Sequence, residues 1–345
     1  MSDFEHVFEK PPEGAAADWT IPQNWAAYTE VEHQTWDTLY ARQMKILPGR
    51  ACDAFMRGLD ALDLNAGGIP DFDVINPKLQ ALTGWTVVCV PGLVPDEVFF
   101  DHLANRRFVS GQFIRKPDQL DYLQEPDIFH DVFGHVPMLT DPDFAAYMEA
   151  YGKGGQRAQS LGMLKNLARL YWYTVEFGLI EEAGAVRAYG AGILSGPTEA
   201  RFAVEAQSPN RIMLNVDRVM RTDYVISDLQ PTYFVIESFA DLYRQTVERD
   251  FDRLYRSLPA GFTYANSAVI DVDNVLHRGT QEYHLRGGRG SGRSPLRGAR
   301  RRRGDQLCER GRSAGQELHR GSRETARCKV NTDELYFRLI SSPLP

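Results

Sequence analysis

Glu125-Pro-Asp-Ile-Phe-His-Asp-Val-Phe-Gly-His-Val-Pro137 contains two histidines five residues apart in a largely apolar segment. The whole chain has only eight histidines, so two this close together require an explanation. A second apolar run, Leu170-Tyr-Trp-Tyr-Thr-Val-Glu-Phe-Gly-Leu-Ile180, contains a single charged residue, Glu176. Two imidazoles and one carboxylate form the ligand set that holds Fe(II) on one face and leaves the other face open to oxygen and substrates. We therefore predict that His130, His135 and Glu176 bind iron.

The spacing of the two histidines does not suit a straight α-helix. A helix advances about 100° per residue, so side chains five positions apart point about 140° away from each other. Gly134 and Pro137 can end a helix here, and we expect His135 to turn back toward the ion from the loop that follows. The spacing also differs from the HExxH motif of zinc proteases, in which histidines at i and i+4 share one face.

Other interpretations of these residues remain open. Each histidine alone could be a hydrogen-bonded structural residue. Large and mostly apolar residues surround Glu176 one helical turn away, and an ionised carboxylate buried there without a partner costs several kcal/mol or more. A metal removes that cost, but so does an arginine partner. Zinc, which hydrolases bind through two histidines and one glutamate, is the main competitor for iron.

The composition limits the class of protein. The chain has 345 residues, is 43% hydrophobic and lacks any apolar run of about 18 residues, so we expect a sizeable core and no membrane span. The first residues lack the features of a secretory signal. Cys52, Cys89, Cys308 and Cys328 have no CxxC spacing. We therefore expect a cytoplasmic protein whose thiols are reduced.

The charge is distributed unevenly along the chain. From Arg286 onward there are fifteen Lys/Arg and six Asp/Glu, a net charge of +9. The whole chain has a net charge of −7, so the first 285 residues carry −16. A body this acidic is a poor partner for nucleic acid, so we expect small-molecule partners. The Arg/Gly-rich residues 285–345 are predicted to be disordered, either as an RNA-binding tail or as a non-native C-terminus. Residues 1–20 are expected to form a flexible arm, and residues 21–284 a single catalytic domain.

Hydrophobic periodicity predicts a mostly α protein with a few short β-strands. Helices are expected at 22–47, 50–64, 76–83, 96–104, 141–151, 161–182 and 236–252, and strands at 85–90 and 108–114.

Four motifs resemble those of the pterin-dependent aromatic amino acid hydroxylases. They are Pro126-Asp-Ile-Phe-His-Asp-Val-Phe-Gly-His-Val-Pro137, Tyr171-Trp-Tyr-Thr-Val-Glu-Phe-Gly178, Ala188-Tyr-Gly-Ala-Gly-Ile-Leu-Ser195 and Gln230-Pro-Thr-Tyr-Phe-Val-Ile-Glu-Ser-Phe239. The resemblance covers about residues 20 to 280. It implies a single catalytic domain of this family's type that uses Fe(II), a tetrahydropterin (tetrahydrobiopterin or a related reduced pterin) and O2 as co-substrate. Within the family, the chain is most similar to the bacterial members that act on L-phenylalanine, because it has no room for the regulatory domain of animal members.

The resemblance also implies roles around the substrate. Arg115 would pair with the carboxylate of the amino acid, and Asp127 would orient Arg115. Ser195 would support a ligand histidine and border the carboxylate of the substrate. Trp172 and Phe177 would line the pocket for the aromatic ring.

A second implied group surrounds the pterin: Gly92, Leu93 and Val94 in a loop at the ring edge, Phe99 stacked on the ring, and Asp131, Ala168 and Tyr171 in the adjoining wall. Animal members differ nearby, with His at the position of Val109, Ser at that of Asp96 and Glu at that of Asp131. The fine contacts with the pterin are therefore expected to differ.

The implied activity is that of a monooxygenase that converts L-phenylalanine into L-tyrosine. Trp172 favours phenylalanine as substrate, since the tryptophan-hydroxylating members tend to have Phe there. The alternatives are a tryptophan or tyrosine hydroxylase of the same family, a zinc hydrolase, and an RNA-binding protein acting through the tail. The missing regulatory and tetramerisation segments imply a monomer or weak dimer.

Overall fold

The computed structural model describes residues 10–121, 125–258 and 261–287. The predictions for residues 1–9 of the arm and for residues 288–345 of the tail lie outside these ranges.

Helices dominate the described chain, which confirms the predicted mostly α class with a few short strands. The α-helices are α1 (Glu30–Ile46), α2 (Asp53–Ala61), α3 (Phe72–Thr83), α4 (Asp96–Ala104), α5 (Pro142–Ser160), α6 (Leu164–Tyr171), α7 (Ala191–Ser195), α8 (Pro197–Glu205), α9 (Val216–Val219), α10 (Phe239–Thr246), α11 (Phe251–Ser257) and α12 (Glu282–Leu285). The strands are β1 (Thr86–Val90), β2 (Arg107–Gly111), β3 (Leu179–Glu182), β4 (Ala185–Ala188), β5 (Asn210–Met213), β6 (Thr232–Ile236) and β7 (Val275–His277). Short 3-10 helices are η1 (Trp25–Ala27), η2 (Pro117–Gln119) and η4 (Val136–Thr140), and π-helices are η3 (Phe129–His135) and η5 (Trp172–Glu176).

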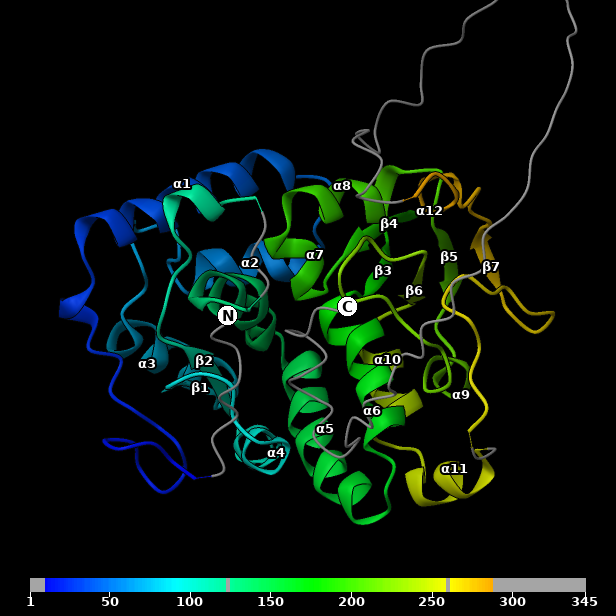
Figure 1. Ribbon diagram of the computed structural model, residues 1–345, viewed down its shortest axis with the longest axis horizontal. Coiled ribbons are helices and arrows are strands. Elements are labelled where there is room, and N and C mark those ends of the chain that lie inside the picture. Colours follow the sequence, from blue (N-terminus) through cyan, green and yellow to red (C-terminus); the bar gives the residue numbers. More distant parts are fainter. Residues whose placement is uncertain (1–9, 122–124, 259–260, 288–345) are drawn as a thin grey trace, which may run out of the picture.

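Two small sheets lie at opposite sides of the helical core (Figure 1). Strands β1 and β2 are parallel and are joined through α4, which makes a compact βαβ unit. The second sheet has the order β4-β3-β6-β5-β7, with a parallel centre and antiparallel edge strands. Helices α5 and α6 lie between the two sheets in Figure 1, and α10 lies against the second sheet. A site at the centre of the molecule is therefore built from the segments that lie between the two sheets.

Polar residues at the helix starts set several boundaries. Thr29 forms a capping box with Glu32 at the start of α1, because each side chain accepts the backbone N–H of the other. The side chain of Asp141 accepts the N–H groups of Asp143 and Phe144, and Pro142 follows in the first turn of α5. These caps satisfy backbone donors that no helical carbonyl can reach.

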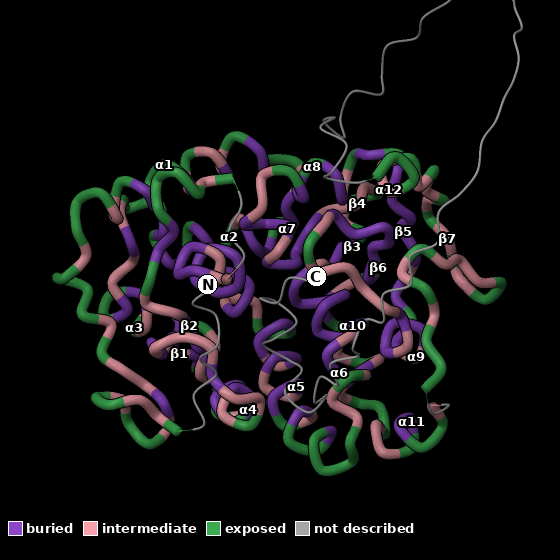
Figure 2. The backbone as a smooth tube through the Cα atoms, in the orientation of Figure 1, coloured by how far each residue is buried: buried purple, intermediate pink, exposed green. Residues whose placement is uncertain are grey.

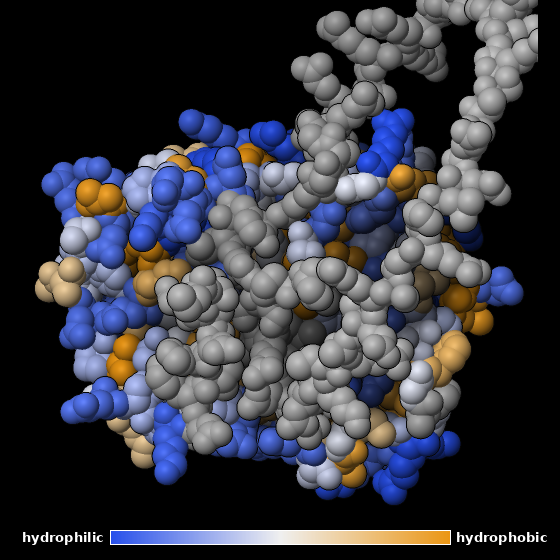
Figure 3. Space-filling view, in the orientation of Figure 1, coloured by the Kyte–Doolittle hydropathy of each residue, from blue (hydrophilic) through white to orange (hydrophobic). Residues whose placement is uncertain are grey.

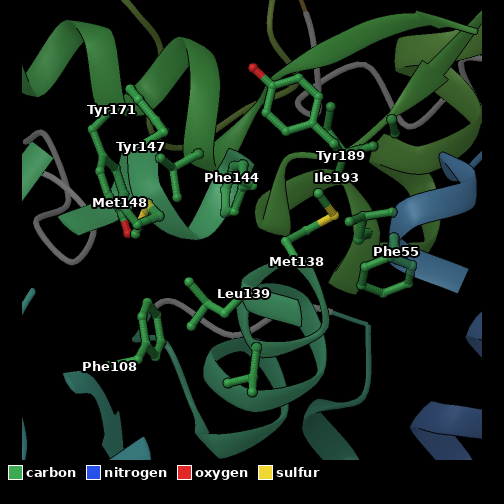
Figure 4. Close-up of a cluster of buried hydrophobic side chains, with 14 of the residues drawn as sticks. Phe55, Phe108, Met138, Leu139, Phe144, Tyr147, Met148, Tyr171, Tyr189 and Ile193 are labelled. Carbon is green, nitrogen blue, oxygen red and sulfur yellow. The ribbon is translucent and has the colours of Figure 1, made fainter. Parts of the chain in front are cut away.

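Aromatic side chains fill the core on both sides of the histidine segment. Phe133 stacks on Phe129 with ring centres 4.7 Å apart and meets Phe55 edge to face at 5.6 Å. Buried residues gather toward the interior of the molecule, and exposed residues lie mostly at its periphery (Figure 2). Figure 4 shows side chains from α2, β2, α5 and α6 converging on the segment with Met138 and Leu139. The visible face outside the grey atoms is mostly hydrophilic with scattered apolar side chains (Figure 3). Truncating a buried phenylalanine to alanine costs about 3–5 kcal/mol in such cores.

Predicted helices are wrong over part of their length: in the range 22–47 the helix α1 begins only at Glu30, and two other ranges contain strand. In the range 161–182, α6 ends at Tyr171 and Leu179–Glu182 forms β3, which pairs with β6. Gly178 allows the change of direction, since a Cβ there would lie 2.2 Å from the carbonyl oxygen of Thr174. In the range 236–252, Ile236 ends β6, and a helix begins only after the N-cap Ser238. Strand pairing with distant residues overrides the helical pattern at both places.

The predicted flexible arm does not hold for its described end. Trp19 is 4% exposed, and Asp18 forms an ion pair of 2.7 Å with Arg107 of β2. The carbonyl oxygen of Asp18 also lies 2.7 Å from Nε2 of the buried His102. Residues from Asp18 onward therefore belong to the folded domain. In the described part of the chain, no helix combines the length and apolarity needed to cross a bilayer.

Candidate active site

The two histidines of the opening motif lie on one face because their helix is a π-helix. In η3, backbone hydrogen bonds join residues five apart, so His135 lies about one turn beyond His130. Their Nε2 atoms are 3.3 Å apart. The expectation that His135 turns back from a loop is thus wrong, since it belongs to the same helix and only the 3-10 helix η4 follows it.

A second π-helix brings Glu176 to the same point. Its Oε1 lies 3.1 Å from Nε2 of His135, and its Oε2 lies 3.6 Å from Nε2 of His130. Glu176 and His135 are buried. Within the described ranges, these residues make the one group of three or more His, Cys, Asp or Glu side chains whose ligand atoms converge. The structure therefore brings together all three predicted ligands.

The donor set fits a single metal ion. Ligand atoms about 2.1 Å from a metal lie about 3.0 Å apart at right angles and about 3.4 Å apart at tetrahedral angles. The two Nε2 atoms lie 3.3 Å apart, and each faces a different oxygen of Glu176, at 3.1 Å from His135 and 3.6 Å from His130. With one atom from each residue, the three ligand atoms lie within 4.8 Å of one another. Two histidines and one carboxylate on one side of the ion match the facial set of non-haem iron and leave the opposite side free.

Ser195 fixes the proton of His130. Oγ of Ser195 donates to the carbonyl oxygen of Ala191 at 2.8 Å and lies 2.9 Å from Nδ1 of His130. Because the single hydroxyl proton is used by Ala191, Nδ1 of His130 must be the donor in the second bond. Nε2 of His130 is then unprotonated, which is the form that binds a metal.

The charges at the site are those a cation requires. Burial lowers the pKa of His130 to about 4, so the ring is neutral at pH 7. Burial alone raises the pKa of Glu176, but the facing rings of His135 and His130 outweigh it and leave this pKa lowered. A neutral imidazole and an ionised carboxylate are the metal-binding forms of both side chains.

Arg115 and Asp127 form a buried ion pair beside the metal ligands. Asp127 Oδ2 accepts from Nε of Arg115 at 2.8 Å and from its backbone N–H at 2.9 Å, and Oδ1 accepts from Nη2 at 2.8 Å. Asp127 is fully buried, and Arg115 is 8% exposed. Oδ1 of Asp127 also accepts the backbone N–H of His130 at 3.1 Å. The structure thus brings the predicted substrate arginine next to the helix η3.

Trp172 and Phe177 lie together at the two ends of η5. Their ring centres are 4.8 Å apart with the planes inclined by 36°. Trp172 is buried, and its ring stacks on that of Tyr224 with ring centres 4.4 Å apart and planes inclined by 17°. Both rings flank the helix that carries Glu176, but neither is among the residues that line the cavity beside the three metal ligands.

A cavity opens on the ligand side of the site. It encloses about 590 Å³ including its open mouth. Its lining includes the three metal ligands and six of the seven residues assigned to the pterin, namely Gly92, Leu93, Val94, Phe99, Asp131 and Tyr171. Ala168 is buried one turn before Tyr171 and is not among the lining residues.

Asp131 has a structural partner in addition to its place in the cavity. Its Oδ2 accepts the backbone N–H of Gly111 at 2.8 Å, which ties the end of β2 to η3. Burial raises the pKa of Asp131 well above its ordinary value. Its carboxyl group is therefore held at the cavity wall close to His130.

The sequence interpretation missed several lining residues. Phe108 lies with its ring 4.9 Å from that of His135, and Phe113 and Glu125 also line the cavity. A signal for this region did exist. The loop that starts at Pro91 and the residues from Gln112 onward both follow strands of one parallel pair, and ligands bind at the carboxyl ends of such strands.

Comparison with known proteins shows what the chain resembles. Residues 18–277 match the family described as biopterin-dependent aromatic amino acid hydroxylase. The phenylalanine-4-hydroxylase of Caulobacter vibrioides is 62% identical over 282 residues, which is 82% of this chain and 96% of that protein. The phenylalanine-4-hydroxylase of Ralstonia nicotianae is 55% identical over 265 residues, 77% of this chain and 84% of that protein. An iron- and phenylalanine-bound crystal structure of phenylalanine hydroxylase from Chromobacterium violaceum has a TM-score of 0.72 at 51% identity, over 76% of this chain and 95% of that chain.

Proposed function

Because this chain belongs to the biopterin-dependent aromatic amino acid hydroxylases, we propose that the cavity beside His130, His135 and Glu176 is its catalytic site. The chain is a phenylalanine 4-monooxygenase that converts L-phenylalanine into L-tyrosine with O2, a tetrahydropterin and non-haem Fe(II). The observation that carries the assignment of the site is the convergence of three ligand atoms within 4.8 Å of one another.

Three residues are proposed to hold the iron: His130, His135 and Glu176. The bound iron and the reduced pterin together supply the activation of O2. The protein keeps the ligands in their metal-binding protonation states, through Ser195 at Nδ1 of His130, through burial of His130, and through the rings of His135 and His130 that face Glu176 and lower its pKa. Holding three ligands on one side leaves room for substrates on the other.

Arg115 is proposed to bind the carboxylate of phenylalanine. Its Nε and Nη2 are occupied by Asp127, whereas Nη1 makes no hydrogen bond within the described residues. A guanidinium fixed by one carboxylate keeps its orientation and can still donate to a second. Trp172 and Phe177 are proposed to enclose the ring of the substrate, because they flank Glu176 and contact each other.

The pterin is proposed to bind along the opposite wall of the cavity. Phe99 and Tyr171 contact each other with ring centres 6.0 Å apart and offer aromatic surface to a flat heterocycle. The loop Gly92-Leu93-Val94 lines the same wall and supplies backbone groups for its polar edge. Asp131 is proposed to contribute its carboxyl group, and Ala168 to support Tyr171 from behind.

The first test is tyrosine formation by the purified protein with Fe(II), O2 and tetrahydropterin each withheld in turn. We expect activity only with all three, and turnover of phenylalanine well above that of tryptophan or tyrosine. Glu176→Ala should lose bound iron and tyrosine formation together, whereas Glu205→Ala, which removes a surface ion pair with Arg50, should keep both. Near-normal tyrosine formation by iron-free Glu176→Ala would overturn the ligand assignment, and zinc in place of iron would favour a hydrolase. The predicted monomer or weak dimer is checked by analytical ultracentrifugation.

A further inference from the structure

We infer that Gln230 is a positioning residue that fixes the indole of Trp172 and thereby sets which aromatic ring the substrate pocket accepts. The inference rests on the proposed function, in which Trp172 forms a wall of that pocket. Gln230 precedes β6 and lies 58 residues from Trp172 along the chain. Neither Gln230 nor Trp172 is among the residues that line the cavity, but Trp172 lies in η5 together with the lining residue Glu176, so Gln230 acts on the substrate pocket through Trp172.

The direct link is a buried hydrogen bond. Nε1 of Trp172 donates to Oε1 of Gln230 at 3.0 Å, and Gln230 is fully buried. An indole has one N–H group at one edge, so this bond restricts the rotation of the ring within its plane as well as its tilt. A buried indole N–H without an acceptor costs about 1–3 kcal/mol, which favours the bonded orientation strongly.

Gln230 also holds the second surface that Trp172 touches. Its Nε2 donates to the carbonyl oxygens of Val225 and Asp228 at 2.5 and 3.2 Å, and its Oε1 accepts the backbone N–H of Val225 at 3.3 Å. These bonds close the segment 225–230 into a compact loop. Tyr224 directly precedes that loop and stacks on the indole at 4.4 Å. One side chain therefore fixes Trp172 both at its edge and across its face.

The backbone of Gln230 is anchored as firmly as its side chain. Its N–H donates to Oε1 of Glu199 at 3.2 Å, and the same oxygen accepts the hydroxyl of Tyr233. Glu199 is buried in the first turn of α8, which directly follows α7 with Ser195. Gln230, which supports Trp172, is thus joined to rigid elements of the core. A substitution of the Gln230 side chain therefore alters the position of the Trp172 ring without changing the metal ligands.

Position 172 lies one turn before Glu176 in η5, so a small rotation of the indole displaces the wall next to the metal. Without Gln230 as acceptor, the indole of Trp172 can tilt away from its present orientation. The pocket can then widen enough to accept the bicyclic ring of a tryptophan substrate. The expected consequence is a loss of discrimination between phenylalanine and tryptophan. Discrimination is measured as the ratio of kcat/KM for phenylalanine to kcat/KM for tryptophan.

The test is a double-mutant cycle with Gln230→Met and Trp172→Phe. Methionine has a similar length and no polar atom that can replace the amide. In the wild-type background Gln230→Met should lower the ratio by roughly three- to tenfold, the effect of one net hydrogen bond. In the Trp172→Phe background, the same change should alter the ratio by less than about twofold, because the indole is already gone. Gln245→Met, which removes a half-buried amide bonded to Asp241, is the matched control and should leave the ratio unchanged.

The outcomes separate the inference from the proposed function. A wild-type protein that makes no tyrosine from phenylalanine contradicts the function itself. Tyrosine formation with an unchanged ratio in Gln230→Met, or equal effects in both backgrounds, overturns the role of Gln230. Should the methionine variant fail to fold, Gln230→Asn keeps the amide but shortens it by one methylene, and the same decrease of the ratio is expected from it.

Discussion

Asp127 holds Arg115 through three hydrogen bonds and accepts a fourth from the backbone N–H of His130. One buried carboxylate therefore joins the arginine proposed to bind the substrate to the helix that carries two metal ligands. This geometry would couple the proposed place of the amino acid to the proposed place of the iron. It also explains why an arginine can be buried here, since a buried charge needs a hydrogen-bonded partner.

Arg115→Lys should weaken binding of phenylalanine more than it slows turnover. An ammonium group cannot keep two bonds to Asp127 and still present a fixed donor to a second carboxylate. We expect KM for phenylalanine to rise roughly tenfold or more, with a much smaller change in kcat. Steady-state kinetics measures both. Arg157→Lys replaces an arginine that also pairs through two bonds, with Asp252 on the surface, and should leave KM unchanged. An unaltered KM in Arg115→Lys would remove this residue from the substrate site.

Ser195→Ala should lower the affinity for Fe(II). The change removes the acceptor for Nδ1–H of His130, so the ring loses its fixed orientation and tautomer. Loss of such a supporting bond typically weakens metal binding by about 10–100-fold. Competition with a chromophoric chelator measures the affinity directly, without any assay of activity. Ser257→Ala removes a hydroxyl bonded to the carbonyl of Leu254 far from the metal ligands and serves as the control. Equal affinities of both variants and the wild type would contradict the assigned role.

The stability of the protein should fall in mild acid through His102. This ring is 1% exposed, its Nε2 contacts the carbonyl oxygen of Asp18, and its Nδ1 makes no hydrogen bond within the described residues. Burial lowers the pKa of His102 below its ordinary value of 6.5. The unfolded chain therefore takes up the proton at higher pH than the folded protein. The contribution of His102 is fully present above about pH 6.5 and is lost as the pH falls through the pKa of the folded state.

One histidine changes the free energy of unfolding by at most about 1.4 kcal/mol per pH unit. Urea denaturation of the metal-free protein between pH 7.5 and 5.5 should show this decrease. His102→Gln offers a similar donor without titrating and should reduce the slope, whereas the partly exposed His277→Gln should not. The same slope in both variants would assign the acid sensitivity to other groups.

Local patterns were sufficient where local interactions determine the structure. The prediction for 96–104 agrees with α4 at both ends, and β1 lies within one residue of the predicted strand. The ligand trio could also be predicted, because a carboxylate such as Glu176 in an apolar run needs a compensating partner wherever the chain folds. The geometry of that trio could not be predicted, since it differs from that of an α-helix with about 100° per residue. A π-helix changes this angle, and no residue between His130 and His135 predicts a π-helix.

The remaining differences depend on partners that are distant in sequence. Leu179 and Ile180 form a strand because they pair with Val235 and Ile236 of β6, more than fifty residues later. The hydrogen bond from Trp172 to Gln230 likewise joins two segments that are distant in sequence, and the sequence of neither segment predicts their contact. Such contacts follow from the assembled fold, and a reading of single segments cannot supply them.

Helix α12 and the residue before it contact the loop beneath Trp172. Nε2 of His284 lies 2.7 Å from the carbonyl oxygen of Leu229, and the hydroxyl of Tyr283 donates to Asp228 at 2.8 Å. Gln281 donates to the carbonyl oxygen of Pro231 at 3.0 Å. Three bonds thus hold the outer side of the segment that Gln230 holds from within.

A chain ending at Gly287 should therefore match the full-length protein in melting temperature and in kcat/KM for phenylalanine, because it retains every one of these bonds. A chain ending at Thr280 loses them, at about 1 kcal/mol each. For a domain of this size, we expect the melting temperature to fall by about 5–10 °C. KM for phenylalanine should also rise, because the loop that supports Trp172 is released. Differential scanning calorimetry and steady-state kinetics on the two truncations measure both effects. Loss of activity already at Gly287 would instead show that the Arg/Gly-rich segment contributes to the catalytic domain.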